Sequence, residues 1–320
     1  MADPRKMLEA DLSGVKNSNT DTQARSFTAS FSEDSPLGAQ LAHDHEVLRE
    51  VKASRFKKPE VTRIITVANQ KGGVGKTTSA VNMAAALADG GLTVLVIDFD
   101  PQGNASTALG VEHKSGIPSI YDVITGEKSL TEIVAKCPDL EGLYIAPATV
   151  DLSSAEIELV MADDREYRLK RAVEEYINVS RETLNVDYVI IDCPPSLGLL
   201  TLNALVAAQE IMIPIQAEYY ALEGLTQLMK TINNVKNSLN PKLSISTILL
   251  TMFDKRTNLS QDVAQEVRNY FPNETLSVEI PRNIRISEAP SFQQTVITYD
   301  PRSTGAVAYL AAAKELASRA

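Results

Sequence analysis

The segment Gln70–Thr78, with the sequence QKGGVGKTT, constrains the possible fold more than any other part of this chain. It follows the apolar run Arg63–Ala68 and leads into the helical candidate Lys76–Asp89. Glycines let backbone N–H groups close around phosphate oxygens, and the N-terminus of a helix adds partial positive charge. An ordinary glycine-rich turn would not require the pair Lys76-Thr77 at this point. The segment therefore predicts a phosphate-binding loop between a strand and a helix.

The rest of the chain after Val61 alternates between apolar runs and helical candidates. Nearly continuous apolar runs are typical of parallel strands that are covered on both faces. The further runs expected to form strands are Thr93–Asp98, Tyr188–Asp192, Ile211–Ile215 and Ile245–Thr251. The further helices expected are Glu166–Thr183, Leu197–Ala208, Leu222–Ser238, Ser260–Tyr270 and Thr304–Ser318. This alternation predicts an α/β fold in a single domain over residues 61–320, with a doubly wound, mostly parallel sheet and helices on both faces.

Residues 1–60 differ in composition from the rest of the chain, because they are rich in Ser, Asp and Lys. A segment of this kind buries little apolar surface, so we expect a largely disordered N-terminal extension. One stretch, Leu41–Val51, has the spacing of a short amphipathic helix. It is either a frayed lead-in to the domain or a docking peptide, and we favour the lead-in.

Composition narrows the setting in which the protein works. The 320 residues are 44% hydrophobic, which is enough for one large α/β domain with a buried core. Two cysteines, Cys137 and Cys193, are too few and too far apart for a disulfide framework or a zinc cluster. We find neither a secretory signal nor a bilayer-spanning apolar run, and we expect a cytoplasmic protein. The net charge of −10 argues against nucleic-acid binding over the whole surface, but it permits a local basic patch.

The phosphate loop departs from the ordinary Walker A pattern in two ways. Gln70 replaces the first glycine, and a second lysine, Lys71, precedes the glycine pair. With KGGVGKTT the chain resembles the ParA/MinD family of deviant Walker A P-loop ATPases, and within it the ParA/Soj-type chromosome-partitioning ATPases. The resemblance extends from Val61 to the C-terminus, and it includes the segments Gln216–Gly224, Leu250–Asp254, Ile280–Asn283 and Glu288–Ser291.

The phosphate loop also supplies most of the predicted site residues. Lys76 is expected to reach the β- and γ-phosphates of ATP, and the Thr77 hydroxyl is expected to complete the coordination of Mg²⁺. The expected nucleotide-binding residues of the loop are Gly72, Gly73, Val74, Gly75, Lys76, Thr77 and Thr78. The resemblance implies that Lys71 reaches the phosphates of the ATP held by the partner subunit, so that ATP bridges a homodimer.

Three carboxylates at strand ends complete the predicted catalytic centre. The segment VIDFDPQGN is similar to the D-x-D-P-Q-G-N switch segment of the family, in which Asp100 matches the residue that orients the attacking water. Asp192 ends the Walker B strand and would hold Mg²⁺ through water. Asp98 either supports the metal shell or serves as an ordinary turn residue. The expected catalytic residues are Lys71, Lys76 and Asp100.

The resemblance further implies an adenine pocket and a DNA-binding surface. The adenine pocket would be lined, mostly by backbone groups, at Met252, Pro281 and Arg282. Non-specific DNA binding requires Lys or Arg side chains that are aimed at phosphates. Each basic residue taken alone is more often a solvated surface charge, and the leading candidates are Arg256, Arg268 and Arg285.

Two functions from different classes stay open at this point. In the first, an ATP-bound sandwich dimer binds double-stranded DNA non-specifically on the nucleoid, and a ParB-type centromere-binding partner stimulates its weak intrinsic hydrolysis and releases it. The alternative is a MinD-like or other cargo-positioning ATPase that acts on a membrane or a protein assembly. A membrane switch needs a C-terminal amphipathic helix with bulky apolar residues and basic flanks. The alanine-rich segment Thr304–Ala320 has only Lys314 and Arg319 as basic residues, which favours the first function and a protein that binds no membrane.

Overall fold

The computed structural model describes residues 36–53, 55–218 and 221–319. Residues 47–320 form one compact unit, and the described residues 36–46 are assigned outside it. Helix α2 (Pro36–Lys52) contains the helix that the sequence predicts over Leu41–Val51. The part of the predicted disordered extension that precedes residue 36 lies outside the described residues.

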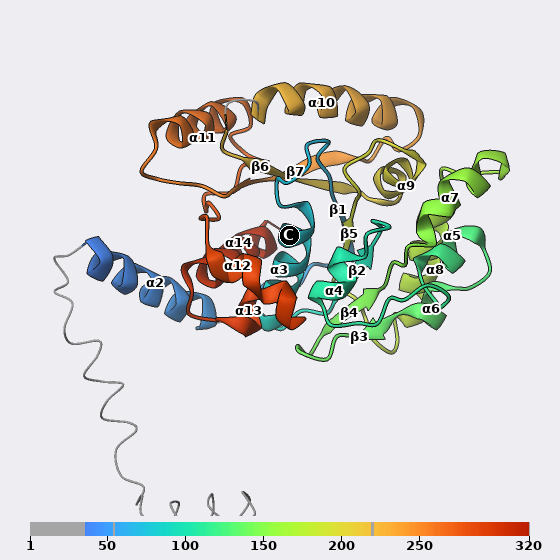
Figure 1. The fold of residues 1–320 in the computed structure, drawn as a ribbon, viewed down its shortest axis with the longest axis horizontal. Coiled ribbons are helices and arrows are strands. Elements are labelled where there is room, and N and C mark those ends of the chain that lie inside the picture. The colour runs from blue at the N-terminus through green and yellow to red at the C-terminus, as the bar shows by residue number, and fades with distance from the viewer. Residues whose placement is uncertain (1–35, 54, 219–220, 320) are drawn as a thin grey trace, which may run out of the picture. The chain divides into compact units, whose positions relative to one another are not determined.

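A single mixed sheet forms the centre of the unit 47–320. Seven strands of the described residues lie in the order β3-β4-β2-β5-β1-β6-β7 (Figure 1). They are β1 (Arg63–Val67), β2 (Val94–Asp98), β3 (Ala135–Lys136), β4 (Leu143–Ala146), β5 (Tyr188–Asp192), β6 (Glu210–Gln216) and β7 (Ser244–Thr251). Every neighbouring pair is parallel except β3 and β4. The prediction of a doubly wound, mostly parallel sheet is therefore confirmed.

Helices cover both faces of this sheet (Figure 1). The predicted helices correspond to α3 (Lys76–Asp89), α8 (Arg168–Ser180), α9 (Leu199–Ala207), α10 (Ala221–Ser238), α11 (Asn258–Tyr270) and α14 (Thr304–Ser318). The sequence does not predict the shorter helices, which are α4 (Asn104–Ala108), α5 (Ile120–Thr125), α6 (Leu130–Ile133), α7 (Leu152–Glu158), η3 (Leu159–Met161), α12 (Ile284–Glu288), η4 (Ala289–Phe292) and α13 (Val296–Tyr299). In the described part of the chain, no helix is long and apolar enough to cross a membrane.

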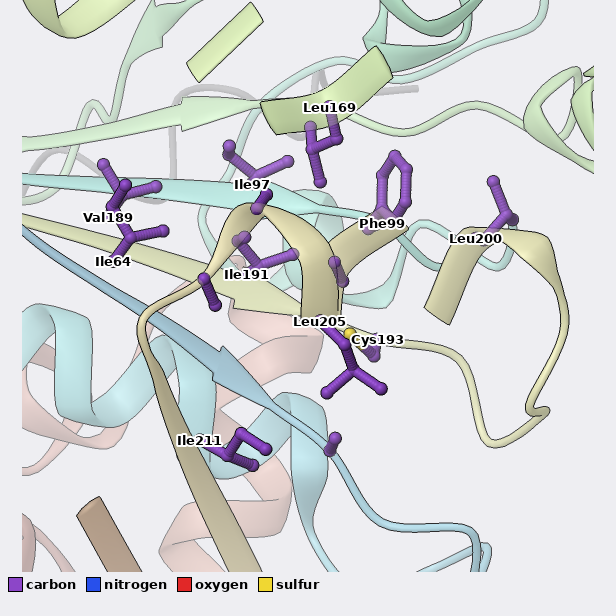
Figure 2. Close-up of a cluster of buried hydrophobic side chains, with 14 of the residues drawn as sticks. Ile64, Ile97, Phe99, Leu169, Val189, Ile191, Cys193, Leu200, Leu205 and Ile211 are labelled. Atoms are coloured by element: carbon purple, nitrogen blue, oxygen red, sulfur yellow. The ribbon is translucent and has the colours of Figure 1, made fainter. Parts of the chain in front are cut away.

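One layer of the hydrophobic core lies between the sheet and helices α8 and α9. Successive side chains of a strand point to opposite faces, so alternate residues of each strand enter this layer. Ile64, Val189 and Ile191 from β1 and β5 pack here with Leu169 of α8 and Leu205 of α9 (Figure 2). The remaining strand residues belong to the second layer, on the opposite face of the sheet.

The second layer holds α3, the helix that follows the phosphate loop. Its buried segment is rich in alanine, and it packs against the alanine-rich α14 and against Ile65 and Val67 of β1. Small side chains allow the two helices and the sheet to approach closely. Because α3 is buried along most of its length, the loop at its N-terminus starts from a fixed position.

The segment just before β1 also belongs to this second layer. Val51 and Phe56 are 5% and 7% exposed, and the Phe56 N–H donates a hydrogen bond to the Gly90 carbonyl at 3.0 Å. A Cβ atom at Gly90 would lie 2.4 Å from the Phe56 ring, so only glycine leaves room for the ring. The Lys314 ammonium donates to the Glu50 carbonyl at 2.6 Å. Buried structure therefore begins before residue 61, where the sequence places the start of the domain.

Candidate nucleotide-binding site

The loop between β1 and α3 has the backbone geometry of a phosphate cradle. Gly73 and Gly75 have φ angles of 75° and 87°, a region that residues with a Cβ atom seldom occupy. A Cβ atom at Gly72 or Gly73 would meet no atom within 4 Å, so the cradle is open on this side. No side chain caps the N-terminus of α3 at Gly75. The N–H groups of the first turn of α3 are therefore available to an anion.

Neighbouring strands fix the outer side of this loop. The Thr251 hydroxyl, at the end of β7, donates a hydrogen bond to the Val74 carbonyl at 2.8 Å. The Asn69 amide donates to the Pro214 carbonyl in β6 at 2.8 Å, and its oxygen accepts from the Lys71 N–H at 3.0 Å. The loop is thus held in its open shape by β6 and β7, which lowers the entropic cost of binding a phosphate.

Lys76 lies inside the loop and is only 7% exposed. Its ammonium group donates a hydrogen bond to the Lys71 carbonyl at 3.2 Å. Burial lowers the pKa of Lys76, and the charges of Asp192, Cys193 and Asp100 oppose this shift. A buried ammonium group that is bonded to the loop backbone is well placed to exchange this carbonyl for a phosphate oxygen.

Asp192, at the end of β5, is a fully buried carboxylate without a protein partner. Neither of its oxygens has a hydrogen-bond partner among the described residues. Burial and then the charge of Asp98 raise the pKa of Asp192 well above its usual value, while the nearby Thr77 hydroxyl and the Lys76 charge oppose the rise. A buried polar group without a partner calls for an explanation such as an ion or water. A hydrated Mg²⁺ between Thr77 and Asp192 fits, because Mg²⁺ prefers oxygen ligands and keeps several waters.

Asp98, at the end of β2, differs from Asp192 because its carboxylate oxygens have hydrogen-bond partners. One oxygen accepts hydrogen bonds from the Ser106 N–H at 2.8 Å and the Ser106 hydroxyl at 2.6 Å, and the other accepts from the Asp100 N–H at 3.4 Å. The Ser106 hydroxyl in turn accepts from the Ala148 N–H at 3.1 Å. Burial raises the pKa of Asp98 to about 6, against the hydrogen bonds from Ser106. One oxygen holds α4 and the other accepts from the Asp100 N–H, so direct metal coordination by Asp98 stays a prediction.

Asp100 lies between the β2 carboxylate and the short helix α4. It is 7% exposed, and its carboxylate accepts from the Gln102 N–H at 3.0 Å. The turn that follows needs Gly103, which has a φ angle of 64° and would clash with His113 if it carried a Cβ atom. The Asp98–Ser106 hydrogen bonds and this turn together fix where the Asp100 carboxylate lies.

The predicted adenine wall lies beside the phosphate loop. The Phe253 N–H donates to the Ile280 carbonyl at 2.9 Å, and the Arg282 N–H donates to the Phe253 carbonyl at 3.3 Å. Met252, between Thr251 and Phe253, has a φ angle of 51°. Since Thr251 holds the loop itself, the structure brings the predicted Met252, Pro281 and Arg282 close to it.

Lys71, the second lysine of the loop, forms an ion pair that the sequence does not predict. Its ammonium group lies 3.2 Å from the Glu218 carboxylate, in the segment after β6, and the two side chains are 36% and 47% exposed. The Lys71 charge is therefore near the surface, at the rim of the cradle, and it is held by a carboxylate of the same subunit.

The three arginines that the sequence favours for DNA binding all have carboxylate partners. Arg256 pairs with Asp254 at 2.8 Å and Arg268 pairs with Glu279 at 2.5 Å. Arg285 pairs with Glu288 at 2.9 Å, and it also lies 3.3 Å from Asp300. Each positive charge is thus partly neutralised within the protein.

The two cysteines are ordinary buried residues. Burial raises the pKa of both Cys137 and Cys193 to about 12. The Cys193 thiol lies 3.1 Å from the Thr66 hydroxyl. Neither thiol is poised to ionise at neutral pH, which agrees with the absence of a ligand spacing in the sequence.

An open glycine loop that follows a central strand of a parallel sheet, with its lysine buried and a bare carboxylate on the neighbouring strand, is the arrangement of the P-loop NTPases. Residues 62–245 match the protein family described as "AAA domain". The chain belongs to the ParA/Soj family of chromosome-partitioning ATPases, as two of its relatives show.

The first relative is the chromosome partitioning protein ParA of Myxococcus xanthus. It is 49% identical over 259 residues, which are 81% of this chain and 89% of that protein. The second, the sporulation initiation inhibitor protein Soj of Bacillus subtilis, is 51% identical over 256 residues, or 80% and 98% of the two chains. A solved structure of cobyrinic acid a,c-diamide synthase from Mycobacterium smegmatis, with bound ATP analog and magnesium, is 38% identical. It has a TM-score of 0.66 and covers 78% of this chain and 92% of that one.

Proposed function

We propose that this protein is a Mg²⁺-dependent ATPase that partitions chromosomal DNA through a nucleotide-switched homodimer. One observation carries the nucleotide chemistry. The buried Asp192 carboxylate has no protein partner, and it lies near both Thr77 and Lys76 of the open loop. The names of the ParA and Soj relatives support chromosome partitioning as the use of this chemistry.

The phosphate loop and the residues around it have different roles in phosphoryl transfer. Backbone N–H groups of residues 72–78 bind the phosphates, and Lys76 moves from the Lys71 carbonyl to a phosphate oxygen. Thr77 and Asp192 hold the Mg²⁺ hydration shell, with Asp98 behind them. The bound Mg²⁺ supplies neutralisation of the charge on the β- and γ-phosphate oxygens. Asp100 orients the attacking water, and the backbone at Met252, Pro281 and Arg282 binds the adenine.

In the proposed dimer, Lys71 exchanges one binding partner for another. In the ATP-bound dimer, Lys71 leaves Glu218 and binds the phosphates held by the partner subunit. The exchange costs little, because an exposed ion pair contributes only about 0.2–1 kcal/mol. ATP thereby shifts the population toward the dimer, and loss of the γ-phosphate reverses the shift.

The DNA-bound form is the active form of the switch. We propose that the dimer binds double-stranded DNA without sequence preference, with Arg256, Arg268 and Arg285 as candidate contacts, and associates with the nucleoid in the cytoplasm. Intrinsic hydrolysis is slow, and a ParB-type centromere-binding protein stimulates it and releases the dimer.

The alternative, a MinD-like membrane switch, would need a C-terminal helix with a free apolar face. In α14 the apolar residues are buried, with Leu310 and Leu316 at 1% and 0% exposure. This helix packs against α3 within the domain. The burial of α14 therefore favours DNA over a membrane as the surface on which the protein works.

Binding to random-sequence duplex DNA tests the proposal. The purified protein is titrated with ATP, with ADP and without nucleotide at two salt concentrations, next to Asp100→Ala. We expect binding that requires ATP, weakens steeply with salt and ignores sequence. No binding in any nucleotide state would remove DNA from the proposed function, while an intact ATPase would keep the nucleotide chemistry.

A further inference from the structure

Helix α10, from Gly224 onward, belongs to a stretch of the chain that lacks acidic residues. The protein has 41 Asp and Glu residues and a net charge of −10, yet none of the residues 224–253 is acidic. The same stretch contains Lys230, Lys236 and Lys242. Local charge here is thus opposite in sign to the charge of the whole molecule.

The packing of α10 separates an apolar side from a polar side. Leu225, Leu228, Ile232 and Val235 are buried in the core. The exposed residues among those whose side chains are described are Thr226, Gln227, Lys230, Asn233, Asn234, Lys236, Asn237 and Ser238. Figure 1 shows α10 as an outer element above β6 and β7. We call these eight exposed residues the α10 outer face.

Spacing places most of this face in one stripe. Gln227, Lys230, Asn234 and Asn237 follow one another at intervals of three or four residues, which puts them on the same side of the helix. From Gln227 to Asn237 the stripe is about 15 Å long at 1.5 Å per residue. Amide, hydroxyl and ammonium groups along it are all hydrogen-bond donors.

The lysines of this region differ from the three arginines considered above. Within the described residues, Lys230, Lys236 and Lys242 make no ion pair, whereas Arg256, Arg268 and Arg285 each have a carboxylate within 3 Å. A phosphate that binds these lysines does not have to displace an internal partner. Acidic residues of other elements lie at one flank, because Thr231 borders a cavity of about 410 Å³ that is also lined by Glu156 and Glu166.

We infer that the α10 outer face binds the phosphate backbone of double-stranded DNA. The inference rests on the proposed function and assigns the DNA contact to a specific surface. Lysine ammonium groups neutralise phosphates, while Asn, Gln and Thr side chains donate hydrogen bonds to phosphate oxygens without reading bases. The described part of α10 exposes no large apolar side chain, so it lacks the anchors that membrane insertion or a protein interface would use.

Salt-dependent DNA binding of charge variants tests the inference. The variant is Lys230→Gln/Lys236→Gln, and fluorescence anisotropy with random-sequence duplex DNA and ATP is the readout. Each lysine that neutralises one phosphate contributes about 0.9 to the slope of log affinity against log salt. We expect the slope to fall by about 2 for each contacting subunit, and the affinity at 0.1 M salt to fall roughly eightfold per lysine.

Two matched variants serve as controls. Lys128→Gln/Lys136→Gln makes the same change in net charge just before α6 and within β3, the strand at the opposite edge of the sheet from β7, and it should keep the wild-type slope. Lys230→Arg/Lys236→Arg retains the charges and should keep most of the affinity. Because Lys230 and Lys236 are exposed, nucleotide binding and thermal unfolding should be the same in every variant.

The outcomes distinguish a failure of the α10 assignment from a failure of the proposed function. Wild-type protein that binds no DNA would defeat both. Wild-type protein that binds, together with a Lys230→Gln/Lys236→Gln variant of unchanged slope, would overturn only the α10 assignment, and Arg256→Gln would then be the variant expected to lose binding. If Lys230→Gln/Lys236→Gln no longer sediments with phosphatidylglycerol vesicles but binds DNA as the wild type does, the α10 outer face contacts membranes. This result would overturn the inference.

Discussion

Asp98 and Asp192 occupy the same register position at the ends of β2 and β5, and neither side chain is exposed to solvent. Burial raises the pKa of Asp98 from 3.8 to about 6 and raises the pKa of Asp192 well above its usual value. The folded protein therefore binds these protons more tightly than the unfolded chain does. Below about pH 4, the Asp98 and Asp192 carboxyls do not lower the folding stability of the protein without Mg²⁺ and nucleotide. As the pH rises through about 6, this stability falls.

The expected size of this effect follows from the shift at Asp98. A rise of about two pKa units corresponds to roughly 3 kcal/mol of unfolding free energy between pH 4 and pH 7. Urea unfolding of nucleotide-free wild type and Asp98→Asn at pH 4 and pH 7 measures it, and the wild type should lose more stability. Equal pH dependence in the two proteins would mean that the Asp98 carboxyl titrates normally.

Glu218 is expected to restrain dimer formation by holding Lys71. Glu218→Gln removes the 3.2 Å ion pair and leaves Lys71 free for the partner subunit. Since an exposed pair of this kind contributes about 0.2–1 kcal/mol, the ATP-dependent dimerisation constant should rise by a factor of roughly 1.4 to 5 for each Lys71 that is released. Sedimentation velocity in ATP gives this constant. Lys71→Ala is the opposite control, and it should abolish both the stable dimer and hydrolysis.

Lys76 and Lys71 should separate nucleotide binding from dimerisation. Lys76 lies inside the cradle, so Lys76→Ala should weaken ATP binding to the monomer by tenfold or more, on the order of one charge-assisted hydrogen bond. Lys71→Ala should bind ATP nearly as well as wild type, because Lys71 acts on the partner. Isothermal titration with ATP at protein concentrations that keep the monomer decides the matter. Similar losses in both variants would place Lys71 in its own subunit's phosphate site.

Asp100→Ala should uncouple binding from hydrolysis. Without the carboxylate that orients water, hydrolysis should fall to background while ATP binding and dimerisation continue. The variant should then stay dimeric, and stay on DNA, after the wild type has turned over its ATP. Phosphate release and light scattering followed together give both quantities. Weak dimerisation of this variant in ATP would show that Asp100 has a different role.

Ser106 is expected to act through Asp98 as a positioning residue. Ser106→Ala leaves one buried Asp98 oxygen with the backbone N–H alone, which should cost about 1–3 kcal/mol of stability. Because α4 and Asp100 lose their anchor, the rate of hydrolysis should fall more than ATP affinity does. Ser106→Thr retains the hydroxyl and should recover both. A purely structural role for Ser106 would lower stability and leave the ratio of rate to affinity unchanged.

Much of this structure follows from local sequence patterns. Long apolar runs and long helices were predicted within a few residues, because their periodicity extends over several turns or pairs. The phosphate loop was predicted because its glycines and lysines lie within nine consecutive residues, between the segments that form β1 and α3. Helices such as α4 and α6, with five and four residues, carry too few positions for a period to be seen.

The parts that the sequence does not predict depend on contacts between distant residues. Glu218 meets Lys71 across 147 positions of the chain, and Thr251 meets Val74 across 177. The carboxylate partners of Arg268 and Arg285 are closer in sequence, but a contact between α11 and the later Glu279 makes the first pair and the turn of α12 makes the second. Charge counting along the chain therefore overestimates how much positive charge these arginines offer to DNA.

The contact between Phe56 and Gly90 has a consequence for what counts as one domain. Similarity to the AAA-domain family begins at residue 62, but the ring of Phe56 fills a space beside α3 that exists only because Gly90 has no side chain. The similarity to the family and the buried core of the folded domain thus begin at two different residues of the chain. A protein trimmed to the family boundary would keep every residue of the catalytic centre, yet its α3–α14 layer would be open to water at the place where Val51 and Phe56 close it.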